Sequence, residues 1–189
     1  MKKAVIFHGT GGNSQLNWFP WLKAELEKNG YQVWVPDLPS AEEPDFDKYL
    51  PFIFKNCPFR IDSETNLIGH SSGAMTILAV LQNLPKEKTV DTCYLIGAFK
   101  DDLGWDSLKK IFTKPFDFDL IKTRAKKFIF IHSDNDPHCP LDGAKFLSEK
   151  LNGELLIQPG QFHFSVNTAG EKYREFPFLL ELILKNHKL

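Results

Sequence analysis

Short apolar runs alternate with longer amphipathic stretches along most of this chain. Six of the runs have apolar residues, many of them β-branched or aromatic, at consecutive positions rather than at every second position. They cover residues 4–8, 32–36, 65–68, 92–96, 127–131 and 154–157. A strand that is apolar on both faces is typical of a sheet covered on both sides. The runs therefore predict six buried strands.

The stretches between these runs have helical character. Apolar residues recur at Trp18, Leu22 and Leu26, a spacing typical of an amphipathic helix, and Asn29 with Gly30 follows as a stop signal. Signals of this kind predict helices over residues 16–29, 46–55, 74–84, 141–151 and 170–185. Strands and helices in alternation predict an α/β fold: one open, mostly parallel sheet with helices on both faces.

One segment interrupts the alternation. Residues 100–124 are longer than a plain crossover requires, and they carry Trp105, Phe112 and Phe116. Ligand crevices form at the carboxyl ends of parallel strands. We therefore expect this segment to be a small cap, with its three aromatic side chains shaping an apolar substrate pocket. The absence of repeats and linkers predicts a single domain over residues 1–189.

Composition and charge narrow the class of protein. The 189 residues are 42% hydrophobic and 25% charged, as in ordinary globular domains, and the formal net charge is −1. Lysines gather within residues 109–127, but Asp117 and Asp119 interrupt them, which predicts a solvated face rather than a nucleic-acid surface. No apolar run approaches membrane-spanning length. We expect a cytoplasmic protein with reduced thiols and no nucleic-acid or membrane partner.

The strongest chemical signal is at residues 69–73, which read Gly-His-Ser-Ser-Gly and place Ser71 between two glycines. The motif follows a predicted strand and opens a predicted helix, the context of a nucleophile elbow. Glycines relieve collisions in so sharp a turn, and the helix N-terminus favours a developing negative charge. The alternative is a glycine-rich turn with Ser72 as the helix cap. The strand–turn–helix context favours Ser71 as a nucleophile.

A serine hydroxyl needs an adjacent base before it can attack a carbonyl carbon. His163 lies in the loop between the last predicted strand and the last predicted helix, which fits the chain order Ser, acid, His. A histidine held by hydrogen bonds between Phe162 and Phe164 is the structural alternative. His8 and His70 belong to the glycine-containing turns, and we expect them to shape those turns.

The acid that orients the base should follow the strand predicted over residues 127–131. Asp134 and Asp136 compete for this role. Asp136 precedes Pro137 and lies further into the loop, so it can bend toward His163, whereas Asp134 can cap the loop. Spacing favours Asp136 without excluding Asp134.

The same loop suggests a metal site, because ligand-type residues occupy every second position: His132, Asp134, Asp136 and His138. Pro137 and Pro140 break an extended strand, and four ligands on one extended segment cannot surround an ion. We predict no metal and no cofactor.

The first predicted strand ends in His-Gly-Thr-Gly-Gly at residues 8–12. A dinucleotide fingerprint would need G-x-G-x-x-G, which is absent. In α/β-hydrolases the equivalent loop supplies one oxyanion donor, and the residue after the nucleophile supplies the other. The predicted donors are the backbone N–H groups of Thr10 and Ser72.

Together these motifs resemble a known family. Residues 69–73, the Phe-Thr-Lys-Pro-Phe of 112–116, the Asn-Asp-Pro of 135–137 and the pair His163-Phe164 are similar to the small serine hydrolases of the retinoblastoma-binding protein nine and bacterial YdeN type. The resemblance implies a compact α/β-hydrolase fold with a triad on Ser71, Asp136 and His163, which settles the acid.

Two positions depart from that family. The mammalian Leu-x-Cys-x-Glu motif is missing around Cys57, so the interaction it mediates is not implied. Thr10 stands where a mammalian relative has asparagine, and the resemblance supplies no substrate.

Two function classes follow. The first is a serine hydrolase that cleaves an ester, thioester or amide of a small acyl substrate through an acyl-enzyme on Ser71. The second is a non-catalytic protein-interaction module on a hydrolase fold. An interaction module has no need for a serine, an aspartate and a histidine in catalytic order, so the sequence favours the enzyme.

Overall fold

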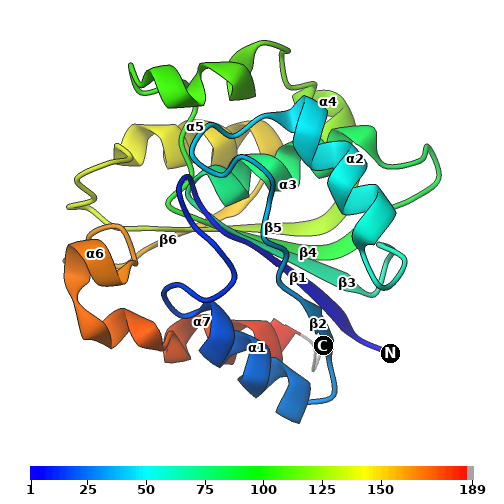
Figure 1. Cartoon of the computed structure of the whole chain (residues 1–189), viewed down its shortest axis with the longest axis horizontal. Coiled ribbons are helices and arrows are strands. Elements are labelled where there is room, and N and C mark those ends of the chain that lie inside the picture. Colours follow the sequence, from blue (N-terminus) through cyan, green and yellow to red (C-terminus); the bar gives the residue numbers. More distant parts are fainter. Residues whose placement is uncertain (187–189) are drawn as a thin grey trace.

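The computed structural model describes residues 1–186, and its centre is one six-stranded sheet (Figure 1). The strands are β1 (Lys3–Phe7), β2 (Gln32–Trp34), β3 (Thr65–His70), β4 (Val90–Ile96), β5 (Ala125–His132) and β6 (Glu154–Ile157). Their order is β2-β1-β3-β4-β5-β6, and every neighbouring pair is parallel. The prediction of a six-stranded, mainly parallel α/β fold is confirmed.

Helices cover both faces of this sheet. On one face lie α1 (Phe19–Lys28) and α7 (Pro177–Asn186); on the other lie α2 (Phe46–Asn56), α3 (Ser72–Asn83) and α5 (Leu141–Leu151) (Figure 1). The shorter elements are α4 (Phe118–Ile121), α6 (Val166–Ala169) and the 3-10 helices η1 (Asp106–Phe112) and η2 (Glu171–Arg174).

The sheet separates two hydrophobic cores, and the side chains of each strand alternate between them. Along β5, Phe128 and Phe130 pack beneath α3 and α5, whereas Ile129 and Ile131 pack beneath α1 and α7. Alternation across a strand explains why both sets are apolar. Strands without a polar face are what the continuous apolar runs predicted.

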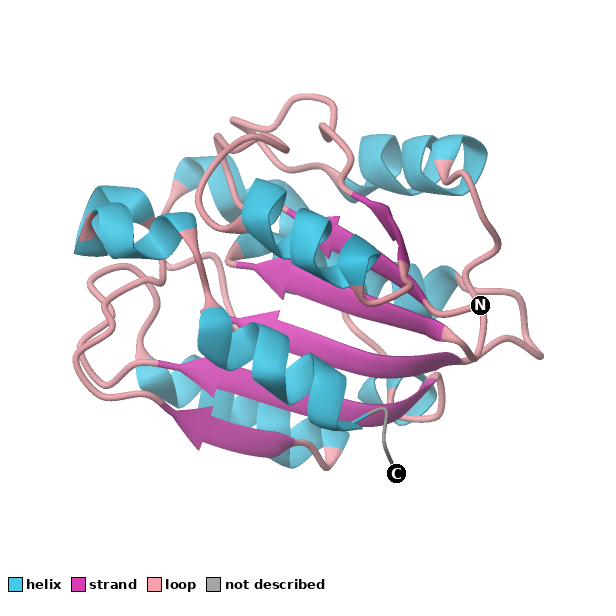
Figure 2. Cartoon of the chain, turned by 90° about the horizontal axis from the view of Figure 1, so that it is seen from below, coloured by secondary structure: helices cyan, strands magenta, loops and turns pink. Residues whose placement is uncertain are grey.

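All strand arrowheads point to the same edge of the sheet (Figure 2). The loops that follow β1, β3, β4, β5 and β6 therefore meet at this carboxyl edge. Residues 8–12, 69–73, 132–140 and 158–165 lie at this edge, so the topology alone gathers the candidate residues.

The predicted helices differ most from the structure at two N-terminal ends. The helix expected over residues 170–185 is two elements, η2 and α7, separated by Glu175, which is extended (φ −133°, ψ 157°), and Phe176. Pro177 disfavours helical backbone at the residue before it and then starts α7. The first helix begins at Phe19 rather than residue 16, with proline in its first turn.

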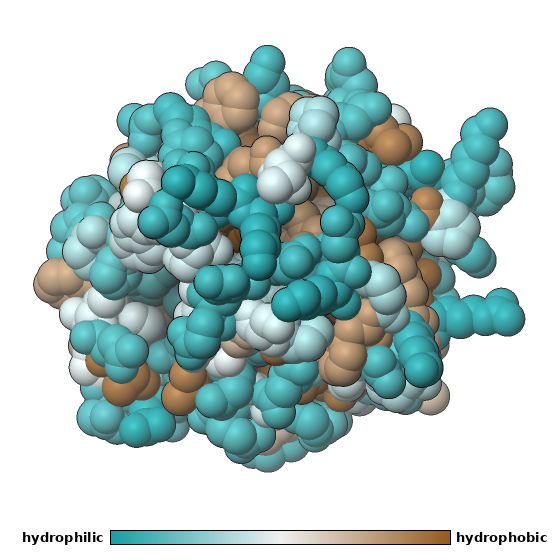
Figure 3. Space-filling model, turned by 45° about the horizontal axis from the view of Figure 1, so that its top comes forward, coloured by the Kyte–Doolittle hydropathy of each residue, from teal (hydrophilic) through white to brown (hydrophobic). Residues whose placement is uncertain are grey.

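The surface offers no continuous basic face along residues 109–127. Six lysines there form ion pairs with carboxylates: Lys109–Asp106, Lys110–Glu43, Lys114–Asp47, Lys122–Asp119, Lys126–Asp91 and Lys127–Glu154. Arg124 is buried, and its guanidinium donates to the carbonyl groups of Pro85 and Lys88. In Figure 3, hydrophilic residues dominate and hydrophobic residues show through in patches. None of the helices within residues 1–186 has the length and apolar character needed to cross a membrane.

Candidate active site

Ser71 occupies the turn between β3 and α3 in a strained conformation. Its backbone has φ 57° and ψ −124°, in the left-handed half of backbone space that a non-glycine residue rarely adopts. The backbone N–H of Ser71 donates to the carbonyl of Ile96 at 2.8 Å, and its own carbonyl accepts from Ala74 at 2.9 Å. The strand–turn–helix context predicted for the motif is present.

The glycines around Ser71 are required by close backbone contacts. A Cβ on Gly69 would lie 2.4 Å from the carbonyl oxygen of Gly73, and one on Gly73 would lie 2.2 Å from that of Phe7. A Cβ on Gly9 would lie 2.9 Å from the Cβ of Ser71. Any side chain at these positions would push the turn open, so this crowding fixes the elbow.

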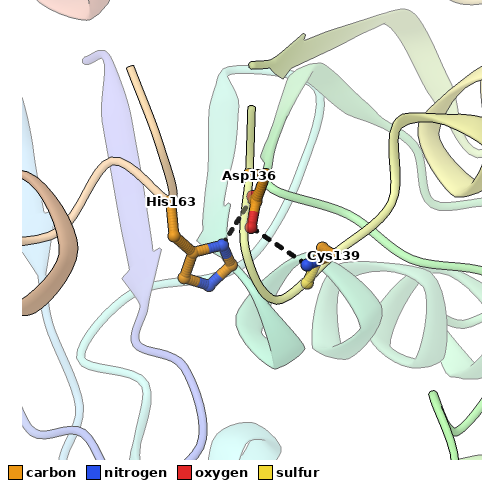
Figure 4. A group of neighbouring side chains, drawn as sticks. All are labelled: Asp136, Cys139 and His163. Atoms are coloured by element: carbon orange, nitrogen blue, oxygen red, sulfur yellow. Dashed lines mark hydrogen bonds and ion pairs between the residues drawn. The ribbon is translucent and has the colours of Figure 1, made fainter. Parts of the chain in front are cut away.

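His163 and Asp136 face each other from the loops after β6 and β5 (Figure 4). The Nδ1 of His163 lies 2.7 Å from the Oδ2 of Asp136, and both side chains are buried, at 8% and 1% exposure. Because Nδ1 donates to the carboxylate, Nε2 carries the lone pair that can accept a proton.

Asp136 is an ionised carboxylate in this setting. Burial opposes ionisation, but the hydrogen bond and electrostatic attraction of His163 and the backbone N–H groups of Cys139 and His138 outweigh it, so the pKa of Asp136 lies below its ordinary value. Both N–H groups lie 2.9 Å from Oδ1. One oxygen thus binds the loop and the other binds His163.

Asp134 does not reach His163. Its Oδ1 accepts the backbone N–H of Gly160 at 2.8 Å, which ties the two loops together. Asn135 Oδ1 accepts from the backbone of Phe162, and Ser133 Oγ accepts from that of Gln161. Of the two competing aspartates, the structure brings Asp136 to the histidine and uses Asp134 in the loop framework.

His70 and Gly97 complete the surroundings of His163. The buried His70 donates from Nε2 to the carbonyl of His163 at 2.7 Å, and burial lowers the pKa of His70 to about 3, so it stays neutral. Gly97 has φ +62°, and a Cβ there would lie 3.0 Å from the Cε1 of His163. Residue types alone did not single out Gly97; its place after β4 was the available signal.

His8 also shapes its turn, as expected. Its Nδ1 donates to the carbonyl of Gly9 at 2.8 Å, and its Nε2 accepts the backbone N–H of Leu38 at 3.0 Å. Burial lowers the pKa of His8, so the neutral ring bridges two loops.

A cleft of about 370 Å³ opens above Ser71. Ser71, His163 and the nearly buried Cys139 all contribute to its lining, and the hydroxyl of Ser71 interacts with the Cys139 thiol, whose pKa burial raises. Within residues 1–186, no hydrogen bond joins the Ser71 hydroxyl to His163. Catalytic hydrogen bonds are often long in the free state and tighten when a substrate binds.

Thr10 and Ser72 meet beside Ser71. The Thr10 hydroxyl donates to the Ser72 Oγ at 3.0 Å, which joins the loop after β1 to the start of α3. Thr10 lines the cleft with Gly9, Gly11 and Gly12. Ser72 begins α3, whose first N–H groups have no partner within the helix.

The three predicted substrate-binding aromatics divide into two groups. Trp105 lines the cleft with Leu103 and Leu108, so the start of residues 100–124 forms one wall. Phe112 and Phe116 are absent from the lining. Phe112 packs behind the cleft-lining Phe99, and Phe116 packs against Phe46. The expected contact of Phe112 and Phe116 with substrate is therefore corrected: apolar burial against the core draws these two rings inward.

The four residues whose spacing suggested a metal site do not form one cluster. His132 hydrogen-bonds the carbonyl of Cys139 at 2.9 Å, and Asp134 bonds Gly160. Within the described residues, the ligand-type atoms that do gather belong to Asp136, Cys139 and His163, all within 4.8 Å (Figure 4). The hydrogen bond between His163 and Asp136 already explains that group.

Comparison with known proteins places this arrangement in a family. Residues 4–182 match the family described as Serine hydrolase. The chain is 28% identical over 183 residues to a Bacillus subtilis (strain 168) protein named as the hydrolase YdeN, covering 96% of this chain and 94% of that one. It is 27% identical over 167 residues to the serine hydrolase RBBP9 of Rattus norvegicus, covering 86% and 87%.

Solved structures agree on the fold. The crystal structure of the B. subtilis ydeN gene product superposes with a TM-score of 0.89 at 24% identity over the full length of both chains. A carboxylesterase structure from Nitrososphaera gargenis gives 0.76 at 16% identity over 99% of this chain and 91% of that one. Est1E from Butyrivibrio proteoclasticus gives 0.71 at 16% identity over 100% and 89%. With the α/β-hydrolase fold and the family match over residues 4–182, the chain belongs to the Serine hydrolase family.

Proposed function

We propose that this protein hydrolyses a carboxylic ester, thioester or amide of a small acyl substrate through an acyl-enzyme on Ser71. One observation carries the proposal: a serine in a strained elbow shares a cleft with a histidine whose Nδ1 is bonded to a buried carboxylate. The family and the esterase neighbours support hydrolysis, and their chemistry favours esters as the first substrates to test.

The attack requires the hydroxyl of Ser71 to turn from Cys139 toward His163. The hydroxyl oxygen then bonds to the substrate carbonyl carbon while Nε2 of His163 takes its proton. Asp136 holds the Nδ1–H tautomer and stabilises the imidazolium. Collapse of the tetrahedral intermediate transfers that proton to the leaving group and leaves the acyl group on Ser71. Water then attacks the acyl-enzyme while His163 takes its proton, and His163 returns that proton to Ser71 as the acid is released.

The tetrahedral intermediate places negative charge on the former carbonyl oxygen. In this proposal the backbone N–H groups of Thr10 and Ser72 bind that oxyanion. The hydrogen bond between the side chains of Thr10 and Ser72 supports this assignment, because it holds the loop after β1 against the start of α3. The crowding of Gly9 on Ser71 sets the same loop close to the nucleophile.

The cleft places apolar and polar side chains at different positions. Leu103, Trp105 and Leu108 form an apolar wall from residues 100–124, while Asn167 and Arg174 contribute polar groups from the segment after β6. We propose that the apolar wall receives an acyl chain. A series of acyl esters of graded chain length, with aminoacyl amides alongside, would identify the preferred substrate.

A fluorophosphonate probe provides the direct test. Phosphonylation of a serine needs an activated hydroxyl and a stabilised oxyanion, so the wild type should be labelled and Ser71→Ala should not. Ser72→Ala is the matched control, because it removes the neighbouring hydroxyl and leaves Ser71. Labelling of Ser71→Ala equal to the wild type would contradict the nucleophile, and a folded wild type that resists both short and long probes would favour the interaction module.

A further inference from the structure

His138 lies in the cleft and has no part in the mechanism above. It is exposed and contributes to the lining beside His163 and Cys139. Its ring meets the ring of His163 edge to face, with centroids 5.1 Å apart and planes at 89°. Its backbone N–H also donates to Asp136 Oδ1 at 2.9 Å. A single residue thus contacts both members of the acid–base pair.

The other sides of the His163 ring are bounded by buried groups. His70 lies with its ring centroid 4.7 Å away and bonds the His163 carbonyl. The backbone of Gly97 faces Cε1 and Nδ1, where a Cβ would come within 3.0 Å and 3.2 Å. His138 is the exposed member of this enclosure. Loss of its ring would leave His163 room to turn out of the hydrogen bond with Asp136.

A second contact joins His138 to residues 100–124. The ring of Trp105 lies 5.7 Å from that of His138 with the planes at 75°, and Trp105 is 44% exposed. Trp105, His138 and His163 therefore form a row of edge-to-face rings from the cap to the base. Burial lowers the pKa of His138 and the neighbouring His163 lowers it further, against the opposing effect of Asp136, so its ring is neutral near neutral pH.

We propose that His138 is a positioning residue: its ring holds the imidazole of His163 against Asp136 and links that imidazole to Trp105 of the cap. The inference deepens the proposed function and rests on it for its catalytic consequence. The aromatic ring, rather than proton transfer by its nitrogen atoms, performs this role. Phenylalanine should therefore replace His138, whereas alanine should not.

The activity test compares His138→Ala with His138→Phe on an ester that the wild type hydrolyses at pH 8. Alanine should lower kcat about tenfold, since a small displacement of a catalytic group has effects of that order, and phenylalanine should stay within about twofold. Phe54→Ala is the matched control, because it removes a similarly exposed ring (43%) that does not line the cleft. Equal losses in the alanine and phenylalanine variants would overturn the ring mechanism, as would an unaffected alanine variant.

The link to the cap has its own test. Because Trp105 also lines the apolar wall, the comparison uses kcat at saturating ester rather than KM. If Trp105 acts on His163 through His138, Trp105→Ala combined with His138→Ala should lower kcat little more than His138→Ala alone. Losses that multiply would show two independent contributions and overturn the link.

A measurement without turnover separates this inference from the proposed function. The His163 Nδ1–H proton, which the bond to Asp136 protects from exchange, can be followed by NMR in the wild type and in both His138 variants. It should exchange faster in His138→Ala and be preserved in His138→Phe. That pattern would support positioning even in a protein that hydrolyses no ester, and an unchanged signal in His138→Ala would overturn it.

Discussion

The elbow around Ser71 and the loops that carry the proposed acid–base pair, Asp136 and His163 (the acid–base loops), fix their side chains by different physical means. At residues 69–73 the backbone is held by exclusion, since Gly69, Gly73 and Gly9 lie where no Cβ can fit. At residues 132–140 and 158–165, polar side chains cross from one loop to bond the backbone of the other. The exclusion acts within the elbow, between Gly69 and Gly73, and between the elbow and the loop after β1, whereas the hydrogen bonds join loops 26 to 28 residues apart in sequence. The two regions meet where His70 bonds the carbonyl of His163.

The largest expected effect comes from comparing Asp136 with Asp134, and it tests whether only one of these aspartates is needed for hydrolysis. Asp136→Asn should lower kcat about ten-thousandfold, because an amide no longer fixes the Nδ1–H tautomer of His163. Asp134→Asn is the matched control in the same loop, and its loss should stay within about tenfold because it weakens only the bond to Gly160. Steady-state hydrolysis rates check both. Comparable losses of kcat in the two variants would mean that the reaction depends on the ordered structure of the loop rather than on control of the His163 tautomer.

The next effect concerns His70, where the two regions meet. Its pKa is about 3 in the folded protein and near 6.5 when unfolded, so the unfolded state binds more protons between these values. Stability is complete above about pH 6.5 and falls as the pH drops toward 3. At pH 4.5 the loss from this group approaches about 3 kcal/mol.

Urea unfolding of the wild type and of His70→Gln at pH 7.0, 5.5 and 4.5 measures that loss. The variant can keep a donor for the carbonyl of His163 but cannot titrate, so its stability should fall less steeply with decreasing pH. It should be the less stable protein at pH 7, because the packing of His70 against Trp18 and Phe19 is lost. Parallel pH profiles would show that His70 is protonated in the folded state.

Gly97 shows that steric exclusion also operates beside His163, the proposed base. Gly97→Ala adds a Cβ 3.0 Å from His163 and should lower kcat about tenfold by displacing the ring. Gly30→Ala is the matched control: its φ is also positive, at +81°, but no atom lies within 4 Å of the added Cβ. Both variants incur a backbone cost of about 1 kcal/mol, so equal stability losses with unequal rates are the expected outcome. Equal rates in Gly97→Ala and Gly30→Ala would exclude displacement of the His163 ring by the added Cβ.

The contrast also explains how far the sequence alone reaches. Apolar runs and stop signals predicted six strands in their order along the chain. A strand buried on both faces needs consecutive apolar residues, and this pattern is visible within a few positions of the sequence. The elbow was recognisable for the same reason, since its glycines are adjacent to the serine. The choice between Asp134 and Asp136 remained open without the family resemblance, because the partners Gly160 and His163 lie far away in sequence.

Residues 100–124 mark the limit of such reasoning. Their excess length predicted a small cap, and Trp105 does line the cleft, but the aromatic residues Trp105, Phe112 and Phe116 look alike in sequence. Only packing separates them: Trp105 meets His138 at the cleft, while Phe112 and Phe116 turn toward the core. Gly97 and His138 were missed because their roles depend on neighbours from other loops.

The smallest expected effect concerns Thr10, where the loop after β1 reaches the elbow. Thr10→Val removes the hydroxyl bond to Ser72 but keeps the side-chain shape and the backbone N–H proposed as an oxyanion donor. The loss of one neutral hydrogen bond is worth about 1 kcal/mol, so kcat should fall about fivefold with KM little changed. Ser72→Ala removes the other half of the same bond and should give a similar loss, and the double variant should lose little more. A hundredfold loss in Thr10→Val alone would instead identify the hydroxyl as a direct oxyanion donor, since deleting such a donor has effects of that size.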